Sequence, residues 1–327
     1  MPVTTHPIST PNPARIHALP HLPPLSVLGA RNERRVLSGP SRSGGFTVIE
    51  LLVAAAAILI LLAIFIPYLE KFRESARRTV CAQHLNLLGT ALRNYAQDNG
   101  YDFPRARYDS TGNPNGYTAF TGPWSTDAFS PNSAVSPNDV TASLWLLLKS
   151  GYVSDPGLFI CPGSDNWPDP MTDAHGRASD LRHRANFQAS YNLSYSYATP
   201  FSNAWNYRLN SDHLPADFAL MSDKNPGFAT NGSSVIGPAH NAPPLDMAVL
   251  NSFNHQRAGQ YVLFAAGYVK FEPNPYCGVE GDNIFTALAP QRMNGEHPAL
   301  DGTGYIGPGI GPAYEFDSYL APTTMDN

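Results

Sequence analysis

A single carboxylate stands at the head of a long apolar stretch, where its charge has a chemical consequence. Glu50 follows the segment Gly44-Gly45-Phe46-Thr47-Val48-Ile49 and precedes sixteen unbroken apolar residues, 51–66. On membrane insertion scales, a carboxylate at such a position costs a few kcal/mol. The charge persists only where another group pairs with it, so the sequence predicts a partner for Glu50.

The apolar stretch is long enough to cross a bilayer. Residues 51–69 carry no charged side chain, and about 20 apolar helical residues span the hydrocarbon core. A buried core helix would normally show a polar stripe, and a secretory signal peptide has a shorter apolar region that ends in a cleavage site. We therefore expect a transmembrane helix. Four basic residues lie on each side of it, so the positive-inside rule does not orient it.

Composition excludes several functional classes. The chain has 327 residues, with 21 Lys and Arg against 26 Asp and Glu, and a net charge of −5 argues against a general nucleic-acid binder. It contains no nucleophile elbow, no phosphate-binding glycine loop and no paired-cysteine zinc motif, so we expect no enzymatic activity. An apolar fraction of 43% with 16 Tyr and 16 Phe predicts a folded domain that contains β-strands.

The motif GGFTVIELL at the head of the apolar stretch closely resembles the N-terminal signature of type IV pilins and type II secretion pseudopilins. The resemblance implies that a prepilin peptidase cleaves between Gly45 and Phe46, and that Phe46 becomes N-methylated. It implies that Glu50 neutralises the terminal amine of a neighbouring subunit, and that Pro67 is the helix-kinking proline of these families. It also implies that residues 1–45 are a cleaved cytoplasmic leader, with the C-terminal domain in the periplasm or on the cell surface.

The helical pattern continues beyond the membrane segment. Its apolar positions are Leu69, Phe72, Ala76, Val80, Leu85, Leu88, Leu92 and Tyr95. Asn99-Gly100 provides a stop signal. We therefore expect one helix over residues 46–99, transmembrane over 46–69 and amphipathic over 70–99.

Residues 100–327 are expected to form a globular domain of short helices and an antiparallel sheet. One helix is predicted after Ser136, with this serine as N-cap. Candidate strands are residues 158–160, 190–197 and 218–221, and residues 260–264 and 268–271 form a predicted hairpin. The predicted fold class is α+β, with the long N-terminal helix packed on this small sheet.

Three stretches resemble a bacterial branch of prepilin-like proteins whose C-terminal domain carries a His, nine residues and then Asp-Gly. They are CAQHLNLLGTALRNYAQDNGYDFP, LFICPGSD and NHQRAGQYVLFAAGYVKF. The chain departs from that pattern because ten residues separate His255 from Ala266, and because Ala266 replaces the Asp. We interpret His255 and Gly267 as structural parts of the hairpin, in preference to a ligand site.

Cys81 and Cys161 both lie in stretches that resemble this branch. The resemblance places the domain in an oxidising compartment, where disulfides persist, and so implies a Cys81–Cys161 bridge between helix and sheet. Two buried free thiols are the alternative. Cys277 is left over, either buried or available to a second copy.

The resemblance also bears on metals, because some major pseudopilins hold calcium in a C-terminal loop. Asp282, within Glu280-Gly281-Asp282-Asn283, is the candidate Ca²⁺ ligand. The segment lacks the EF-hand spacing, so solvated loop acids and no bound cofactor are the favoured interpretation. The histidines after residue 45 show no paired metal-ligand spacing.

Together these features predict a non-enzymatic pilin-like or pseudopilin subunit of the inner membrane. Its expected partners are the prepilin peptidase and other pilin-like subunits, with no nucleic acid. A second hypothesis is a membrane-tethered periplasmic binding module, for instance for polysaccharide, that does not polymerise. The aromatic residues considered for its surface are Trp124, Trp145, Trp167 and Trp205.

Overall fold

The computed structural model describes residues 45–111, 122, 127, 129–173, 175–178, 181–227, 242–287 and 311–321. The chain divides into two compact units, residues 1–58 and 59–327. The described part of the first unit is the beginning of helix α1. The second unit holds the rest of α1 and a globular region, the described residues from 99 onward, which we call the head.

Helix α1 (Val48–Asp98) is a continuous helix of 51 residues, which confirms the long helix predicted over residues 46–99. It begins with a capping box. The Thr47 hydroxyl oxygen accepts a hydrogen bond from the backbone N–H of Glu50 at 3.2 Å, and the Glu50 carboxylate accepts one from the backbone N–H of Thr47 at 2.8 Å. The helix ends before Gly100, whose φ of +67° suits a glycine.

The C-terminal part of α1 contributes to the core of the head. Its buried side chains are Cys81, Leu85, Leu88, Ala91, Leu92 and Ala96. Periodicity placed Phe72 on the packed face, but its side chain is 70% exposed, so burial begins about two turns later than the apolar pattern suggests. At Gly89 the helix approaches the sheet closely, since a Cβ there would lie 2.8 Å from the Leu263 side chain.

The head contains a four-stranded antiparallel sheet in the order β1-β2-β3-β4. Its strands are β1 (Tyr195–Tyr197), β2 (Ala219–Asp223), β3 (Gln260–Phe264) and β4 (Val269–Glu272). Strands β3 and β4 form the predicted hairpin, and Gly267 has a φ of +90° in its turn. The long helix and the small antiparallel sheet agree with the predicted α+β class.

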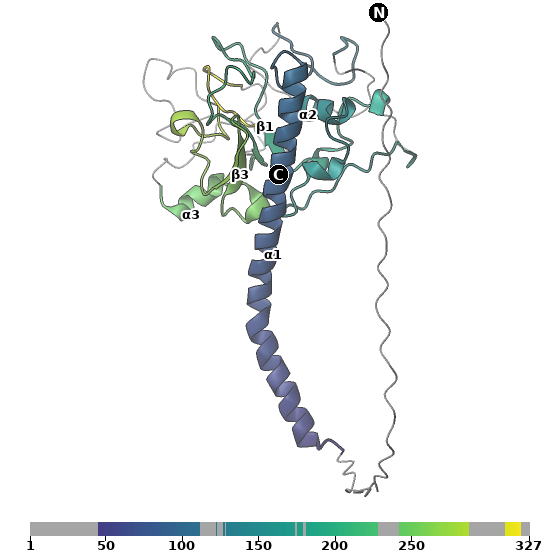
Figure 1. The fold of residues 1–327 in the computed structure, drawn as a ribbon, viewed down its shortest axis with the longest axis vertical. Coiled ribbons are helices and arrows are strands. Elements are labelled where there is room, and N and C mark those ends of the chain that lie inside the picture. Colours follow the sequence, from purple (N-terminus) through teal and green to yellow (C-terminus); the bar gives the residue numbers. More distant parts are fainter. Residues whose placement is uncertain are drawn as a thin grey trace, which may run out of the picture. The chain divides into compact units, whose positions relative to one another are not determined.

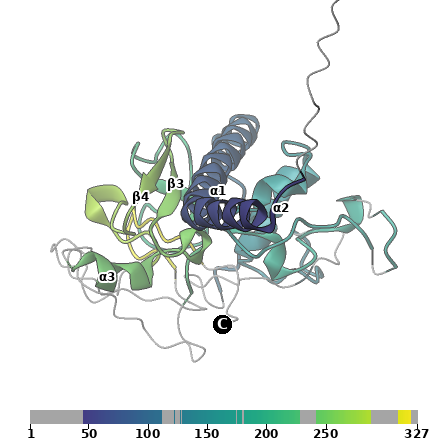
Figure 2. The same ribbon diagram turned by 90° about the horizontal axis from the view of Figure 1, so that it is seen from below.

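Short helical segments complete the head. They are α2 (Val140–Lys149), α3 (Pro244–Met247) and the 3-10 turns η1 (Pro156–Phe159), η2 (Leu181–His183), η3 (Ser190–Asn192), η4 (Ala248–Leu250), η5 (Phe253–His255) and η6 (Val279–Gly281). In both ribbon views the C-terminal part of α1 lies between α2 and the sheet (Figure 1, Figure 2). The N-cap of α2 is Asp139, which accepts from the Ala142 N–H; the predicted cap, Ser136, lies four positions before the helix.

Two strand predictions are wrong. Most of the predicted strand 158–160 belongs to η1, because Asp155 caps this turn through the Gly157 N–H at 2.7 Å and Pro156 has the φ of a first helical position. Of residues 190–197, only 195–197 form a strand. All three residues of this strand are buried. The alternating pattern in the sequence therefore does not correspond to one buried and one solvent-exposed face of the strand.

Candidate functional site

The first candidate site is the N-terminal motif. Gly45 and Phe46 directly precede α1, and the Phe46 side chain is 87% exposed. From Phe46 to Leu69, every large apolar side chain that the structure describes is at least half exposed. Among the described residues, α1 is the helix long and apolar enough to cross a membrane. Pro67 lies within this helix.

Glu50 has partners in its own chain. Its carboxylate accepts hydrogen bonds from the backbone N–H of Thr47 at 2.8 Å and from the Thr47 hydroxyl at 3.0 Å. The sequence reasoning singled out Glu50 for its charge and missed Thr47. The signal was present, because Thr followed three residues later by Glu before an apolar run is a capping-box pattern.

A second group of reactive side chains is buried in the head, and we call it the Cys-His cluster: Cys81, Cys161, Asp223 and His255. Cys81 comes from α1, Cys161 from the segment after η1, Asp223 from the end of β2 and His255 from η5. Each of the four residues is 0% exposed. One potential ligand atom from each residue lies within 4.8 Å of those of the other three.

Tight backbone turns position Cys161 and His255. The Cys161 sulfur accepts a hydrogen bond from the Gly163 N–H at 3.3 Å. A side chain at position 163 would collide with the carbonyl oxygen of Asn254, so glycine is required for this segment to pack on η5. His255 ends η5, where the Ser252 hydroxyl oxygen caps the turn by accepting from the Asn254 N–H at 3.3 Å.

The Asp223 carboxylate is anchored from two directions. One oxygen accepts from the backbone N–H of Tyr261 at 2.7 Å, across the pairing of β2 with β3. The other accepts from the Asn254 side-chain amide at 2.9 Å and from the Cys81 thiol at 3.1 Å. The carboxylate therefore holds a defined orientation toward the other three members of the cluster.

His255 links the cluster to α1. Its Nε2 lies 3.6 Å from the Cys161 sulfur and 3.3 Å from Oδ2 of Asp223. Its Nδ1 lies 3.0 Å from Oε1 of Glu74, an oxygen that also accepts from Nε of Arg78 at 2.9 Å. One ring nitrogen thus faces the cluster, and the other faces a carboxylate outside it.

The local electrostatics favour an ionised Cys161. Burial would lower the pKa of His255, but hydrogen bonds to Asp223 and Cys161 outweigh it and raise that pKa to about 10. A hydrogen bond from Cys81, together with the one to His255, lowers the pKa of Cys161 against the effect of burial. Burial raises the pKa of Cys81. These contacts shift Cys161 toward the thiolate, the form in which a cysteine reacts or binds metal.

The burial of the cluster limits the chemistry that it can perform. A cysteine beside a histidine can act as a nucleophile with its base, but here both side chains are fully buried, and a substrate would need a path to the sulfur. A bond between the two sulfurs, or a small cation held among the four residues, requires no such path. These are the two kinds of chemistry that suit the site.

Several site predictions can be compared with this geometry. Cys81 and Cys161 are neighbours but are free thiols in this structure, so their disulfide stays a prediction. Cys277 is a half-buried free thiol. His255 lies in η5, before the hairpin, so its assignment to the hairpin is wrong. Gly267 is in the hairpin turn.

Asp282 is not a solvated loop acid. It is only 4% exposed, and its carboxylate accepts a hydrogen bond from the Ser318 N–H at 3.0 Å. Burial and the nearby Asp317 carboxylate hold the pKa of Asp282 well above its usual value. In the described chain, the residues that converge as potential metal ligands are those of the Cys-His cluster.

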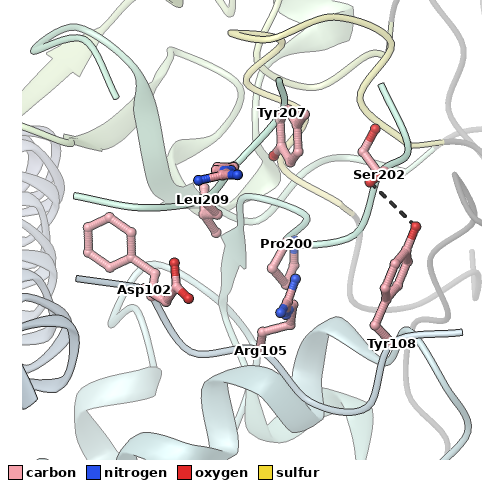
Figure 3. A pocket seen from close by; sticks show the side chains of 9 residues that line it. Asp102, Arg105, Tyr108, Pro200, Ser202, Tyr207 and Leu209 are labelled. Carbon is pink, nitrogen blue, oxygen red and sulfur yellow. Dashed lines mark hydrogen bonds between the residues drawn. The ribbon is translucent and has the colours of Figure 1, made fainter. Parts of the chain in front are cut away.

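A separate pocket of about 190 Å³ opens on the head (Figure 3). Its lining residues are Asp102, Phe103, Arg105, Tyr108, Pro200, Ser202, Tyr207, Arg208 and Leu209. The Tyr108 hydroxyl donates to the carbonyl oxygen of Ser202 at 3.4 Å, and the Tyr207 hydroxyl donates to that of Thr199 at 2.6 Å. The pocket is therefore polar, with two arginines and one carboxylate.

The three tryptophans that the structure describes do not form a shared surface at this pocket. Trp145 is fully buried, whereas Trp167 and Trp205 are exposed and lie outside the pocket lining. Trp124 lies outside the described residues.

No protein family, curated protein or solved structure matches this chain in the comparisons.

Proposed function

We propose that the chain is a non-enzymatic pilin-like or pseudopilin subunit. In this proposal, prepilin peptidase cleaves between Gly45 and Phe46, Phe46 is N-methylated, and the mature chain assembles with other pilin-like subunits. The observation that carries the proposal is the exposed apolar first half of α1, with Glu50 at its start. Such a surface needs lipid or neighbouring apolar helices to cover it.

The proposed topology follows from the same helix. Residues 46–69 would cross the inner membrane once, and the head would lie in the periplasm or on the cell surface. The second half of α1 already buries its apolar stripe in the head. The first half, whose large apolar side chains are exposed, therefore remains available for contacts with lipid or with the helices of other subunits.

In the proposed assembly step, the Glu50 carboxylate gives up its hydrogen bonds with Thr47 and pairs with the terminal amine of a neighbouring subunit. In the isolated chain Glu50 caps its own helix through Thr47, an interaction worth about 1 kcal/mol. An unpaired charge in an apolar bundle is penalised by roughly 3–5 kcal/mol. Within the bundle, leaving the Glu50 carboxylate without the Phe46 amine of a neighbour would therefore cost more than losing the cap.

Sheared surface filaments test the proposal. The sheared fraction should contain the chain, and mass spectrometry of that material should find its N-terminal peptide beginning at methylated Phe46. Cells that lack the prepilin peptidase provide the control and should yield uncleaved protein in the membrane alone. An uncleaved chain in cells with active peptidase would contradict the proposal.

The pocket is the observation that favours the second candidate, a tethered binding module. Its two arginines offer hydrogen-bond donors to a polar or anionic sugar. Glycan binding by the detergent-solubilised protein that is lost in Arg105→Ala, with no chain in the sheared fraction, would favour this candidate over assembly.

A further inference from the structure

We propose that Cys81, Cys161, Asp223 and His255 form a structural site for one tetrahedrally coordinated divalent cation of the zinc class. The site would join α1 to three separate segments of the head. This inference is independent of the proposed assembly function, because it concerns the interior of the head and not the exposed half of α1.

The spacing of the ligand atoms fits a tetrahedral zinc ion. With Zn–S near 2.3 Å and Zn–N and Zn–O near 2.1 Å, a tetrahedron separates sulfur from nitrogen by about 3.6 Å and nitrogen from oxygen by about 3.4 Å. The corresponding distances are 3.6 Å from Cys161 to His255 and 3.3 Å from His255 to Asp223. Cys81 lies 3.1 Å from the other oxygen of Asp223, Oδ1, so this distance is not a ligand separation in a shell that Oδ2 completes.

The ligand types point to zinc. Two thiolates, one imidazole and one carboxylate form a mixed sulfur, nitrogen and oxygen set, whereas Ca²⁺ and Mg²⁺ take oxygen ligands. Four protein ligands would fill a tetrahedral shell, and all four residues are 0% exposed. A closed shell of this kind is typical of a structural zinc site, because a catalytic one keeps a position open for water or substrate.

The surroundings of the four residues also resemble those of a metal site. A histidine that binds metal through one ring nitrogen usually donates from the other to a carboxylate or carbonyl group. His255 faces the cluster with Nε2 and places Nδ1 3.0 Å from the Glu74 carboxylate. The Cys161 sulfur accepts from the Gly163 N–H, and the Tyr195 hydroxyl donates to the Cys81 sulfur at 3.4 Å. Each sulfur thus has a donor outside the cluster.

A Cys81–Cys161 disulfide is the rival state, because it would use the same two sulfurs. A disulfide needs the sulfurs about 2.05 Å apart, whereas two zinc-bound thiolates lie about 3.8 Å apart. A disulfide would not involve His255 or Asp223. Both side chains nevertheless lie beside the two sulfurs, although they come from distant parts of the chain. A cation engages all four residues, which is why we favour it.

Metal analysis of the full chain, purified in detergent without chelator, tests the proposal. We expect about one zinc per wild-type chain. Cys81→Ser, Cys161→Ser and His255→Gln should each lower zinc affinity on the order of a hundredfold or more. Cys277→Ser removes the third cysteine, which lies outside the cluster, and should retain the metal.

A measurement on the wild type avoids any dependence on how the variants fold. After reduction and removal of metal, added Co²⁺ should give thiolate-to-cobalt absorption and the intense visible bands of a tetrahedral site, and Zn²⁺ should displace it. Alkylation should be slow for two thiols until a chelator is added. A metal-free purified protein that binds no Co²⁺ after reduction would overturn the proposal. So would a linked Cys81–Cys161 peptide in non-reducing digests.

Discussion

The Cys161 sulfur lies 3.6 Å from Nε2 of His255, although 94 positions separate the two residues. A shared neighbour brings their segments together. Ser194 exchanges a hydroxyl hydrogen bond of 2.8 Å with Ser164, and its carbonyl oxygen accepts from the Asn254 side chain at 2.8 Å. The Cys-His pair is thus held by polar contacts that do not involve the pair itself, so the site is preorganised.

Removal of metal should destabilise the head. A ligand that binds only the native state stabilises it by about 4 kcal/mol when its free concentration is a thousand times its Kd. We therefore expect a chelator to lower the thermal unfolding midpoint of the detergent-solubilised chain, and Zn²⁺ but not Mg²⁺ to restore it. Cys277→Ser should respond like the wild type. An unchanged midpoint would speak against a structural metal.

Glu74→Gln should weaken metal binding without abolishing it. Glu74 faces Nδ1 of His255 at 3.0 Å, so it orients the ring and is not itself a ligand. Loss of such a carboxylate typically lowers metal affinity by about 10–100-fold. Competition with a chromophoric chelator would measure the affinity, and the Co²⁺ spectrum should remain tetrahedral. Glu70→Gln, an exposed site one turn earlier on α1, is the matched control and should bind as the wild type does.

Gly163→Ala should destabilise the head by about 1–3 kcal/mol, the usual range for overpacking. The new methyl group would collide with the Asn254 carbonyl oxygen and lie 3.2 Å from Cε1 of His255. Urea unfolding followed by tryptophan fluorescence would give the change in free energy. Metal affinity should fall together with stability, because the collision displaces η5. If the variant keeps the stability and the metal affinity of the wild type, the segment around residue 163 and η5 can move apart at no energetic cost, which would contradict this prediction.

The sequence revealed the features that depend on local pattern. The helix α1 follows from uninterrupted apolar periodicity up to Gly100, and the β3–β4 hairpin follows from two apolar runs around a glycine turn. The strand predicted over residues 158–160 failed because Asp155 and Pro156 favour a turn that outweighs three apolar residues.

The Cys-His cluster could not be predicted from local patterns in the sequence. Its successive members are 80, 62 and 32 positions apart, and no helical or strand period relates such residues. Only the pairing of β2 with β3 and the packing of α1 bring them together. The capping box is a different case. Thr47 and Glu50 form a capping-box pattern that is visible in the sequence, but Glu50 was interpreted only through its charge.

Processing should be blocked by Gly45→Leu. A side chain at position 45 meets no neighbour within 4 Å, so the substitution should leave folding intact and affect only recognition by the peptidase. Wild-type chains should lose 45 residues and retain 282, with a side-chain net charge near −9 because the leader contains five Arg and one Glu. Intact mass spectrometry distinguishes the two forms. Normal cleavage of the variant would place the processing site elsewhere.

Variants at Glu50 and Thr47 separate the charge of Glu50 from its role as a helix cap. Gln also serves at this position of a capping box, so Glu50→Gln keeps the cap and removes the charge. Glu50→Leu removes both. Thr47→Ala removes the hydroxyl that Glu50 contacts at 3.0 Å and keeps the charge. All three should be cleaved normally and retained in the membrane. The two Glu50 variants lose a carboxylate, which favours insertion, and Thr47→Ala leaves the apolar stretch 51–66 unchanged.

Assembly should then follow the charge and not the cap. An amine left without its counter-ion in an apolar bundle is penalised by roughly 3–5 kcal/mol, and each 1.4 kcal/mol is about tenfold in an equilibrium constant. Glu50→Gln and Glu50→Leu should therefore lower incorporation into cross-linked ladders at least about a hundredfold at matched expression, whereas Thr47→Ala should assemble like the wild type. If Glu50→Gln forms ladders as well as the wild type, the carboxylate charge has no part in assembly. If Thr47→Ala and Glu50→Leu fail whereas Glu50→Gln assembles, the cap explains the defect. If the wild type itself forms none, the tethered binding module becomes the better account.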